Sequence, residues 1–200
     1  FGVKNDSLGS YSPYLQWVVA IFMILFGVNF NAYYYIIYRH FKKAFKMEEV
    51  RCYFAIILIA TAIIFANILD RCVSIFDALT KSVFQVASLI TSTDFNLWPQ
   101  ICRTVLVLIM FIGACAGSTG GGIKVSRVIV LFKTMIKELH SYIHPKSIRK
   151  VNLDGKPVEH EIVRSINVYI VTFVIIFASS VFMVAFDGKD LVTNFTAVLT

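Results

Sequence analysis

The sequence predicts an all-α membrane protein in which membrane-spanning helices alternate with shorter, re-entrant helices. The first observation is composition, because 58% of the 200 residues are hydrophobic and only 16% are charged, whereas soluble domains have about 45–50% and about 25%. The second is the arrangement of long uncharged runs, and the third is the clustering of Lys and Arg between some of them. This composition excludes a disordered chain and argues against a soluble enzyme, which would expose large apolar patches.

Four uncharged runs are long enough to cross a bilayer, which takes about 20 apolar residues in a helix. They comprise residues 7–38, mostly apolar over 14–38, and residues 52–69, 104–123 and 165–186. Two more apolar stretches, residues 82–93 and 191–200, are too short to span and predict short helices.

The basic residues set the expected topology. Fourteen of the 19 Lys and Arg residues lie within residues 39–51 and 124–164, and basic loops face the cytoplasm. If residues 82–93 crossed the membrane, these two segments would lie on opposite sides. We therefore expect residues 82–93 to enter and return from outside as a re-entrant hairpin, which points to a pore or transport site. Topology then accounts for the net charge of +7, and no nucleic-acid partner is expected.

The order of elements indicates an internal repeat. A span, an acidic outer segment and a short apolar helix follow residue 50, and the same order follows residue 164. Two short matches accompany this order: Ile63-Ile64-Phe65-Ala66 with Ile175-Ile176-Phe177-Ala178, and Phe84 with Phe195. The repeated architecture supports the hypothesis more strongly than the letters do, and repeated units around an axis can build a pore.

A glycine-rich block interrupts the third span. Five of the ten glycines lie between residues 113 and 122, and each interior glycine costs a helix about 1 kcal/mol relative to alanine. Close helix packing through Gly113 and Gly117 is an alternative, but it explains two glycines only. A phosphate-binding loop is excluded because Ile123 stands where that motif needs Lys. We favour a flexible intramembrane loop near the cytoplasmic side, formed by Gly113, Ala114, Cys115, Ala116, Gly117, Ser118, Thr119, Gly120, Gly121 and Gly122.

A polar tip follows the short helix in residues 82–93. An ion filter lines its path with backbone carbonyls, and a helix C-terminus adds partial negative charge. The candidate filter residues are Ile90, Thr91, Ser92, Thr93 and Asp94. The alternative is a polar turn in an extracellular loop, in which Asp94 is simply solvated.

The sequence shows no pattern for covalent chemistry or a bound metal. The cysteines at 52, 72, 102 and 115 form no CxxC pair, and the histidines at 40, 140, 144 and 160 lie in or beside the basic segments. The predicted spans contain no Asp, Glu, Lys or Arg, which argues against a proton-relay carrier. We therefore expect no enzyme, and no metal beyond a transient ion.

Several of these motifs resemble the Trk/Ktr/HKT superfamily of potassium transporters, in particular its bacterial TrkH-type membrane subunits. The matching stretches are Gly27-Val-Asn29-Phe30, Glu48-Glu49-Val-Arg51-Cys-Tyr53, Phe84-Gln85-Val-Ala-Ser88-Leu-Ile-Thr91, Asp94-Phe95-Asn-Leu-Trp98-Pro99, Phe111 to Val125 around the glycine block, and His144-Pro145. The resemblance covers nearly the whole sequence, and the glycine block is its most specific part.

The resemblance implies repeated span–pore helix–span units with re-entrant hairpins around a central pore, four repeats in all. Residues 1–51 would hold an outer loop, the last span of repeat two and a cytoplasmic loop, and residues 52–141 would be repeat three. Residues 142–164 would be a cytoplasmic loop, and residues 165–200 would begin repeat four. The sequence would then be part of a larger protein.

The resemblance also implies a function and partners. A potassium ion, with sodium as the alternative, would pass the outer filter and a gate at Gly113–Gly122 during uptake across the bacterial cytoplasmic (inner) membrane. A homodimer in the lipid bilayer and a cytosolic nucleotide-binding regulatory subunit of the TrkA/KtrA type are the implied partners. The alternative from another class is a non-conducting, truncated fragment of a membrane helix bundle.

One departure concerns the filter. The family's third filter usually reads Thr-Thr-Thr-Gly-Phe or -Tyr, whereas Thr91-Ser-Thr-Asp94-Phe95 lacks the glycine. Either Asp94 replaces it or residues between Thr91 and Ser92 are absent, and the second fits better. Asp does not adopt positive φ as readily as Gly, so filter geometry and selectivity depend on which holds.

Overall fold

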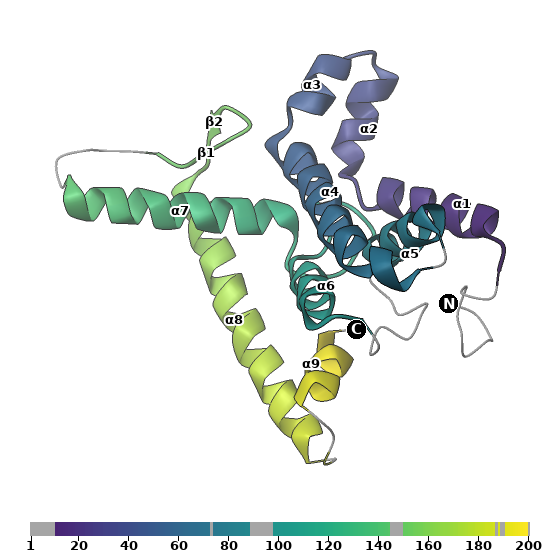
Figure 1. Ribbon diagram of the computed structural model, residues 1–200. Helices are drawn as coiled ribbons and strands as arrows, with labels where there is room; N and C mark the ends of the chain where they lie inside the picture. The colour runs from purple at the N-terminus through teal and green to yellow at the C-terminus, as the bar shows by residue number, and fades with distance from the viewer. Residues whose placement is uncertain are drawn as a thin grey trace.

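The described residues are mostly helical in the computed structural model of the chain, which describes residues 11–72, 74–88, 98–144, 150–186, 188 and 191–199. Figure 1 shows a cluster of helices from which one long helix, α7, extends sideways and another, α8, descends. The elements are α1 (Pro13–Phe26), α2 (Phe30–Ile37), α3 (Phe41–Lys46), α4 (Glu48–Ile68), a 3₁₀ turn (Leu69–Arg71), α5 (Ile75–Ser88), α6 (Gln100–Ile112), α7 (Val125–Ile143), β1 (Asn152–Leu153), β2 (Lys156–Pro157), α8 (His160–Ala185) and α9 (Leu191–Leu199).

Two of the four predicted spans are continuous helices, as expected. The segment Glu48–Arg71, with 24 residues, and α8, with 26, are long and apolar enough to cross a membrane. The first contributes a stripe of Ala60, Ile64 and Ile68 to a buried cluster, because residues four apart lie on one helix face. Helix α8 instead contacts α7 and α9 and buries none of its residues fully.

The first predicted span is wrong as a single helix. It consists of α1 and α2, which meet at an angle of 91°. Asn29 causes the new start, because its side chain accepts a hydrogen bond from the Asn31 amide (2.9 Å) and so caps α2. Gly27 allows the close approach of α4, since a Cβ there would lie 2.1 Å from the Tyr53 hydroxyl oxygen.

The third predicted span also departs from a continuous helix, in the way its glycines predict. Helix α6 ends at Ile112, and α7 begins only at Val125. Residues 113–117 are not helical, which rules out the alternative of helix packing through Gly113 and Gly117. Helix α6 alone is too short to span.

The short helix expected from residue 82 begins seven residues earlier, at Ile75. The charged residues that seemed to exclude this turn form an ion pair one helical turn apart, between Lys81 Nζ and Asp77 Oδ2 at 2.8 Å. Helix α5 packs against both α1 and α4. The Trp17 indole on α1 donates to the Thr80 hydroxyl at 2.9 Å.

The last two helices follow the order predicted after residue 164, a long apolar helix and then a short one. Helix α9 follows α8 as the short helix expected after residue 190 and packs against it, with the Phe177 and Phe195 rings 4.7 Å apart. Phe111 on α6 contacts Phe173 and Phe177 on α8. An aromatic cluster thus joins α6, α8 and α9.

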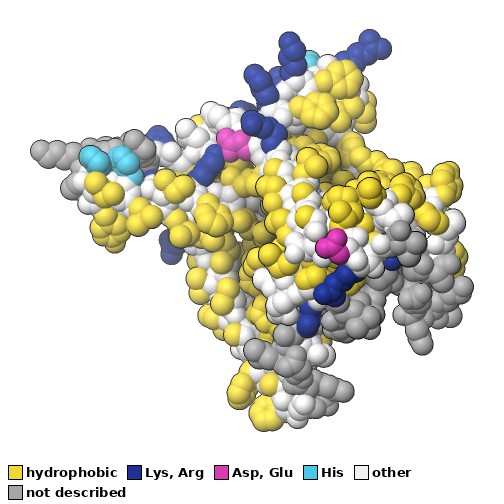
Figure 2. Space-filling view, viewed as in Figure 1, with side chains coloured by type: hydrophobic (Ala, Val, Ile, Leu, Met, Phe, Trp, Pro, Cys, Tyr) yellow, Lys and Arg dark blue, Asp and Glu magenta, His cyan; other side chains and the backbone are white. Residues whose placement is uncertain are grey.

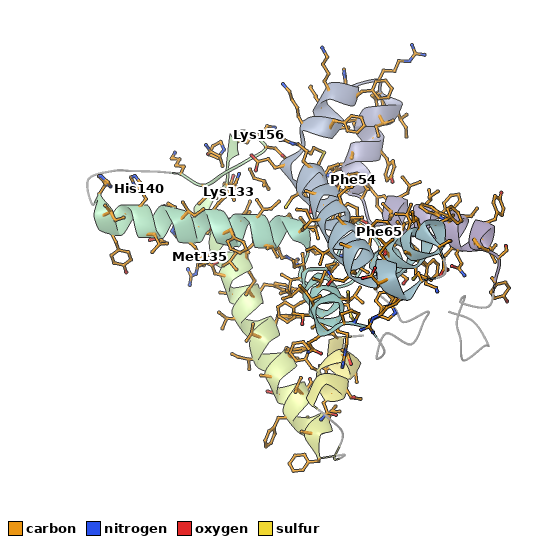
Figure 3. The ribbon with its side chains drawn as sticks, in the orientation of Figure 1. Phe54, Phe65, Lys133, Met135, His140 and Lys156 are labelled. Atoms are coloured by element: carbon orange, nitrogen blue, oxygen red, sulfur yellow. The ribbon has the colours of Figure 1, made fainter. Side chains whose placement is uncertain are left out.

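The basic segments are more ordered than the sequence suggested. Helix α3 lies within residues 39–51, and a β1–β2 hairpin turns at Asp154-Gly155 within residues 142–164. Asp154 Oδ1 accepts a hydrogen bond from the Glu48 amide (2.6 Å), and Lys133 on α7 contacts Glu48 and the Asn152 carbonyl. Lys133 and hairpin residue Lys156 lie on one side of α7 and Met135 on the other (Figure 3). The hairpin therefore links the start of α4 to α7.

Candidate functional site

The candidate filter cannot be placed, because Ile90, Thr91, Ser92, Thr93 and Asp94 lie outside the described residues. The helix that leads to them is described as far as Ser88, and its last two turns bury Gln85 and Ser88. The filter role of residues 90–94 stays a prediction.

The candidate gate, Gly113–Gly122, is described in full and folds back on itself. The amides of Ile123 and Lys124 donate to the Phe111 and Ile112 carbonyls at the end of α6, at 3.3 and 2.9 Å. The Val125 amide donates to the Ala114 carbonyl at 3.0 Å. We call residues 113–124 the loop. Because its two ends are hydrogen-bonded to each other, the loop forms a closed turn.

Two glycines are sterically required where the ends of the loop meet. Gly113 has φ +76°, and a Cβ on it would lie 2.1 Å from the Gly121 carbonyl oxygen. Gly122 has φ +82°, and its Cβ would lie 2.6 Å from the Gly113 Cα. A larger residue would meet both strain and backbone overlap. Gly121, next to Gly122 in the sequence, has open space around the position of an added Cβ.

The loop packs into the break between α1 and α2. The Cys115 amide donates to the Gly27 carbonyl at 3.0 Å, and the Cys115 side chain is fully buried. Asn29 lies beside the loop as well, 3.7 Å from the position of a Cβ on Gly117. Both chain interruptions therefore meet in one place.

Glu49, in the first turn of α4, fastens these pieces together. Its Oε1 accepts hydrogen bonds from the Ala116 amide (2.5 Å) and the Ser126 amide (3.2 Å). Its Oε2 accepts one from Asn29 Nδ2 (2.7 Å). The residue is 4% exposed, and bonds to a buried carboxylate are among the strong ones. One side chain thus holds the loop, the start of α7 and the α1–α2 break.

The sequence did not single out Glu49 as a site residue. An acidic residue in the first turn of a helix ordinarily complements the helix dipole, and here Glu48 occupies the same turn. The partners of Glu49 on the loop and α7 are 67 and 77 residues away. Only the three-dimensional arrangement shows that Glu49 faces the loop, whereas half-exposed Glu48 pairs with Lys133.

Lys124, at the end of the loop, donates to backbone carbonyls, whereas Glu49 accepts from backbone amides. Its Nζ reaches the carbonyl oxygen of Gly120 and, at 3.5 Å, that of Ser118. Its φ of +84° is a conformation that residues other than glycine rarely adopt. The loop therefore turns N–H groups toward a carboxylate and carbonyl groups toward an ammonium.

Within the part of the chain that the structure describes, no three His, Cys, Asp or Glu side chains are grouped as metal ligands. The loop is a compact, non-helical segment held by a few polar contacts, placed where a span is interrupted.

Comparisons with known proteins agree with one another. A family model described as "TrkH: Cation transport protein" matches residues 1–199. The chain is 28% identical to the Trk system potassium uptake protein TrkH of Salmonella typhimurium, over all of this chain and 43% of that protein. It is 28% identical to the Trk system potassium uptake protein TrkG of Escherichia coli, over 99% of this chain and 42% of that protein.

The fold is also that of a solved structure. The crystal structure of the potassium transporter TrkH from Vibrio parahaemolyticus superposes with a TM-score of 0.89 at 25% identity, over 100% of this chain and 45% of that one. The chain thus spans less than half the length of these relatives.

Proposed function

The chain belongs to the TrkH family of cation transport proteins, and on that premise we propose that it forms part of a protein that takes up potassium, with sodium as the alternative ion. Two of its relatives, TrkH of Salmonella typhimurium and TrkG of Escherichia coli, are potassium uptake proteins, which supports the choice of ion. The observation that carries the mechanism is the loop, which interrupts the third span and closes on itself.

In the proposed mechanism, ions leave water at an outer filter around residues 90–94 and then meet the loop as a gate. Irregular backbone at membrane depth is tolerated where it lines a water-filled path or is buried in protein. The loop is held within the protein, since its inner amides donate to the Glu49 carboxylate and the Gly27 carbonyl, and as a gate it would border the ion path. Potassium would be transported cargo, and no covalent chemistry is involved.

The proposal includes the expected setting. The protein would lie in the bacterial inner membrane as a homodimer and bind a cytosolic nucleotide-binding subunit. The surface suited to that subunit is basic: Lys and Arg side chains gather over α3 in Figure 2, where Lys42 and Lys43 are exposed. The proposal keeps the domain division that the sequence predicts, in which residues 52–141 form repeat three.

The test is potassium uptake by the complete reading frame that contains this sequence. In a host that lacks its own potassium uptake systems, it should restore growth in low-potassium medium and drive uptake of rubidium tracer. If the protein reaches the membrane but restores neither growth nor rubidium uptake, the transport proposal is wrong and a non-conducting structural role is favoured. For the gate, deletion within Ala114–Gly121 should raise tracer leak, and unchanged flux would count against gating.

A further inference from the structure

We propose that Lys124 holds the loop closed with its own side chain. Its ammonium binds the Ser118 and Gly120 carbonyl oxygens, which would otherwise bind a permeating monovalent cation. The inference rests on the proposed function, because it assigns a positioning residue to the same gate. It adds a second cation site, distinct from the candidate filter, made by the Ser118 and Gly120 carbonyls.

The first support is the set of partners that the ammonium takes. Lys124 Nζ contacts only backbone carbonyl oxygens among the hydrogen bonds of the described residues, and no ion pair of that part of the chain includes it. A half-buried ammonium is usually solvated or paired with a carboxylate. Carbonyl oxygens are instead the groups that replace the water of a potassium ion. The lysine therefore sits among ligands suited to a monovalent cation.

The second support is the backbone of Lys124 itself. Its φ of +84° is one of three positive values among non-glycine residues in the described ranges. A strained conformation persists only where surrounding contacts determine it. The contacts here are the hydrogen bond that the Lys124 amide donates to the Ile112 carbonyl (2.9 Å) and those that its side chain donates to loop carbonyls. In this conformation the side chain contacts carbonyls only four and six residues earlier in the chain.

The third support is the charge arrangement across the loop. Glu49 draws the Ala116 and Ser126 amides to one side, and Lys124 draws the Ser118 and Gly120 carbonyls to another. Peptide groups between a carboxylate and an ammonium are oriented by both charges. If the ammonium left, the carbonyls would lack a positive partner and could accept a passing ion. Lys124 would then act as a plug that competes with the transported ion.

The experiment uses the full-length protein in proteoliposomes, with rubidium tracer flux as the readout. Lys124→Met should raise flux by about tenfold, which corresponds to about 1.4 kcal/mol of lost preference for the closed loop. Lys137→Met is the matched control, since it removes the same charge from α7 where Lys137 pairs with exposed Glu138. That variant should transport like wild type. Lys124→Gly keeps the backbone conformation possible and should leak as well.

A thiol variant separates charge from shape. In Lys124→Cys, 2-aminoethyl methanethiosulfonate restores an ammonium and should suppress the leak, whereas the neutral methyl reagent should not. Treated wild-type protein controls for the native cysteines. Equal suppression by both reagents would show that bulk alone closes the loop and would overturn the proposal. So would wild-type flux in both Lys124→Met and Lys124→Gly. A wild-type protein with no flux would instead overturn the proposed function.

Discussion

Glu49→Gln should loosen the loop without changing the size of the side chain. The remaining Oε1 still accepts from the Ala116 and Ser126 amides, now without charge. The new amide nitrogen faces Asn29 Nδ2, which is also a donor. Asn29 cannot turn over to offer its oxygen, because that oxygen caps α2 by accepting from the Asn31 amide. The substitution therefore replaces one hydrogen bond with two opposed donors and weakens two others.

The expected cost is about 3 kcal/mol in the free energy of opening the loop. Hydrogen bonds to charged groups contribute about 1.5–3 kcal/mol and neutral ones about 1 kcal/mol, so losing one and weakening two reaches this value. Glu48→Gln is the matched control in the same helical turn. Its carboxylate is 34% exposed and pairs with Lys133, and such pairs contribute about 0–1 kcal/mol.

Cys115 provides the assay, because it lies in the loop and is fully buried. In a full-length protein that keeps Cys115 as the only reporter, thiol labelling requires the loop to open, so its rate follows the free energy of opening. Glu49→Gln should speed labelling by about 100-fold, and Glu48→Gln by less than about fivefold. Cys102, buried in the other core cluster, reports general unfolding when it is the only thiol kept.

Two outcomes would contradict this role of Glu49. If Cys115 labels at the wild-type rate in Glu49→Gln, the three hydrogen bonds do not hold the loop. If Cys102 labelling rises by the same factor as Cys115 labelling, Glu49 stabilises the whole bundle and not the loop specifically.

Two further substitutions test the supports of the loop. Gly122→Ala should cost about 1–3 kcal/mol from its positive φ, and overlap with the Gly113 Cα adds to this cost, so Cys115 labelling should become at least about tenfold faster. Gly121→Ala, which has open space around it, should leave the labelling rate unchanged, and equal effects of the two variants would contradict the steric account. Asp154→Ala should remove the cap on the Glu48 amide at a cost of about 1 kcal/mol and speed proteolysis of the β1–β2 hairpin, whereas unchanged proteolysis would mean that this bond does not hold the hairpin.

The continuous spans could be predicted because length and apolarity are local properties of a sequence. The 91° bend between α1 and α2 could not be read from hydrophobicity, since one glycine and one asparagine hardly alter an apolar run. Asn29 before Phe30 is a local signal of a helix start, but the uncharged apolar run around it predicts a single span. The early start of α5 was missed for the opposite reason, because Asp77 and Lys81 neutralise each other only when the helix is formed.

The candidate site also combines local features, which the sequence predicts, with long-range contacts, which it does not. The glycine block predicted an interruption because the helix penalty of glycine is intrinsic, and its position was correct. The residues that bind the loop were not predictable, because Glu49 and the loop residue that it binds, Ala116, are 67 residues apart in the sequence. The positive φ of Lys124 follows from the return of the loop onto α6, a long-range constraint that no local sequence pattern records.

The two chain breaks explain each other. In a membrane protein, backbone groups released from a helix must find partners within the protein. The Gly27 carbonyl, at the end of α1, receives the Cys115 amide of the loop, and Glu49 joins Asn29 of one break to Ala116 of the other. Each interruption therefore supplies groups that the other needs. It follows that a movement of the loop must also release the α1–α2 break, which couples the proposed gate to α2 and, through it, to the basic surface around α3.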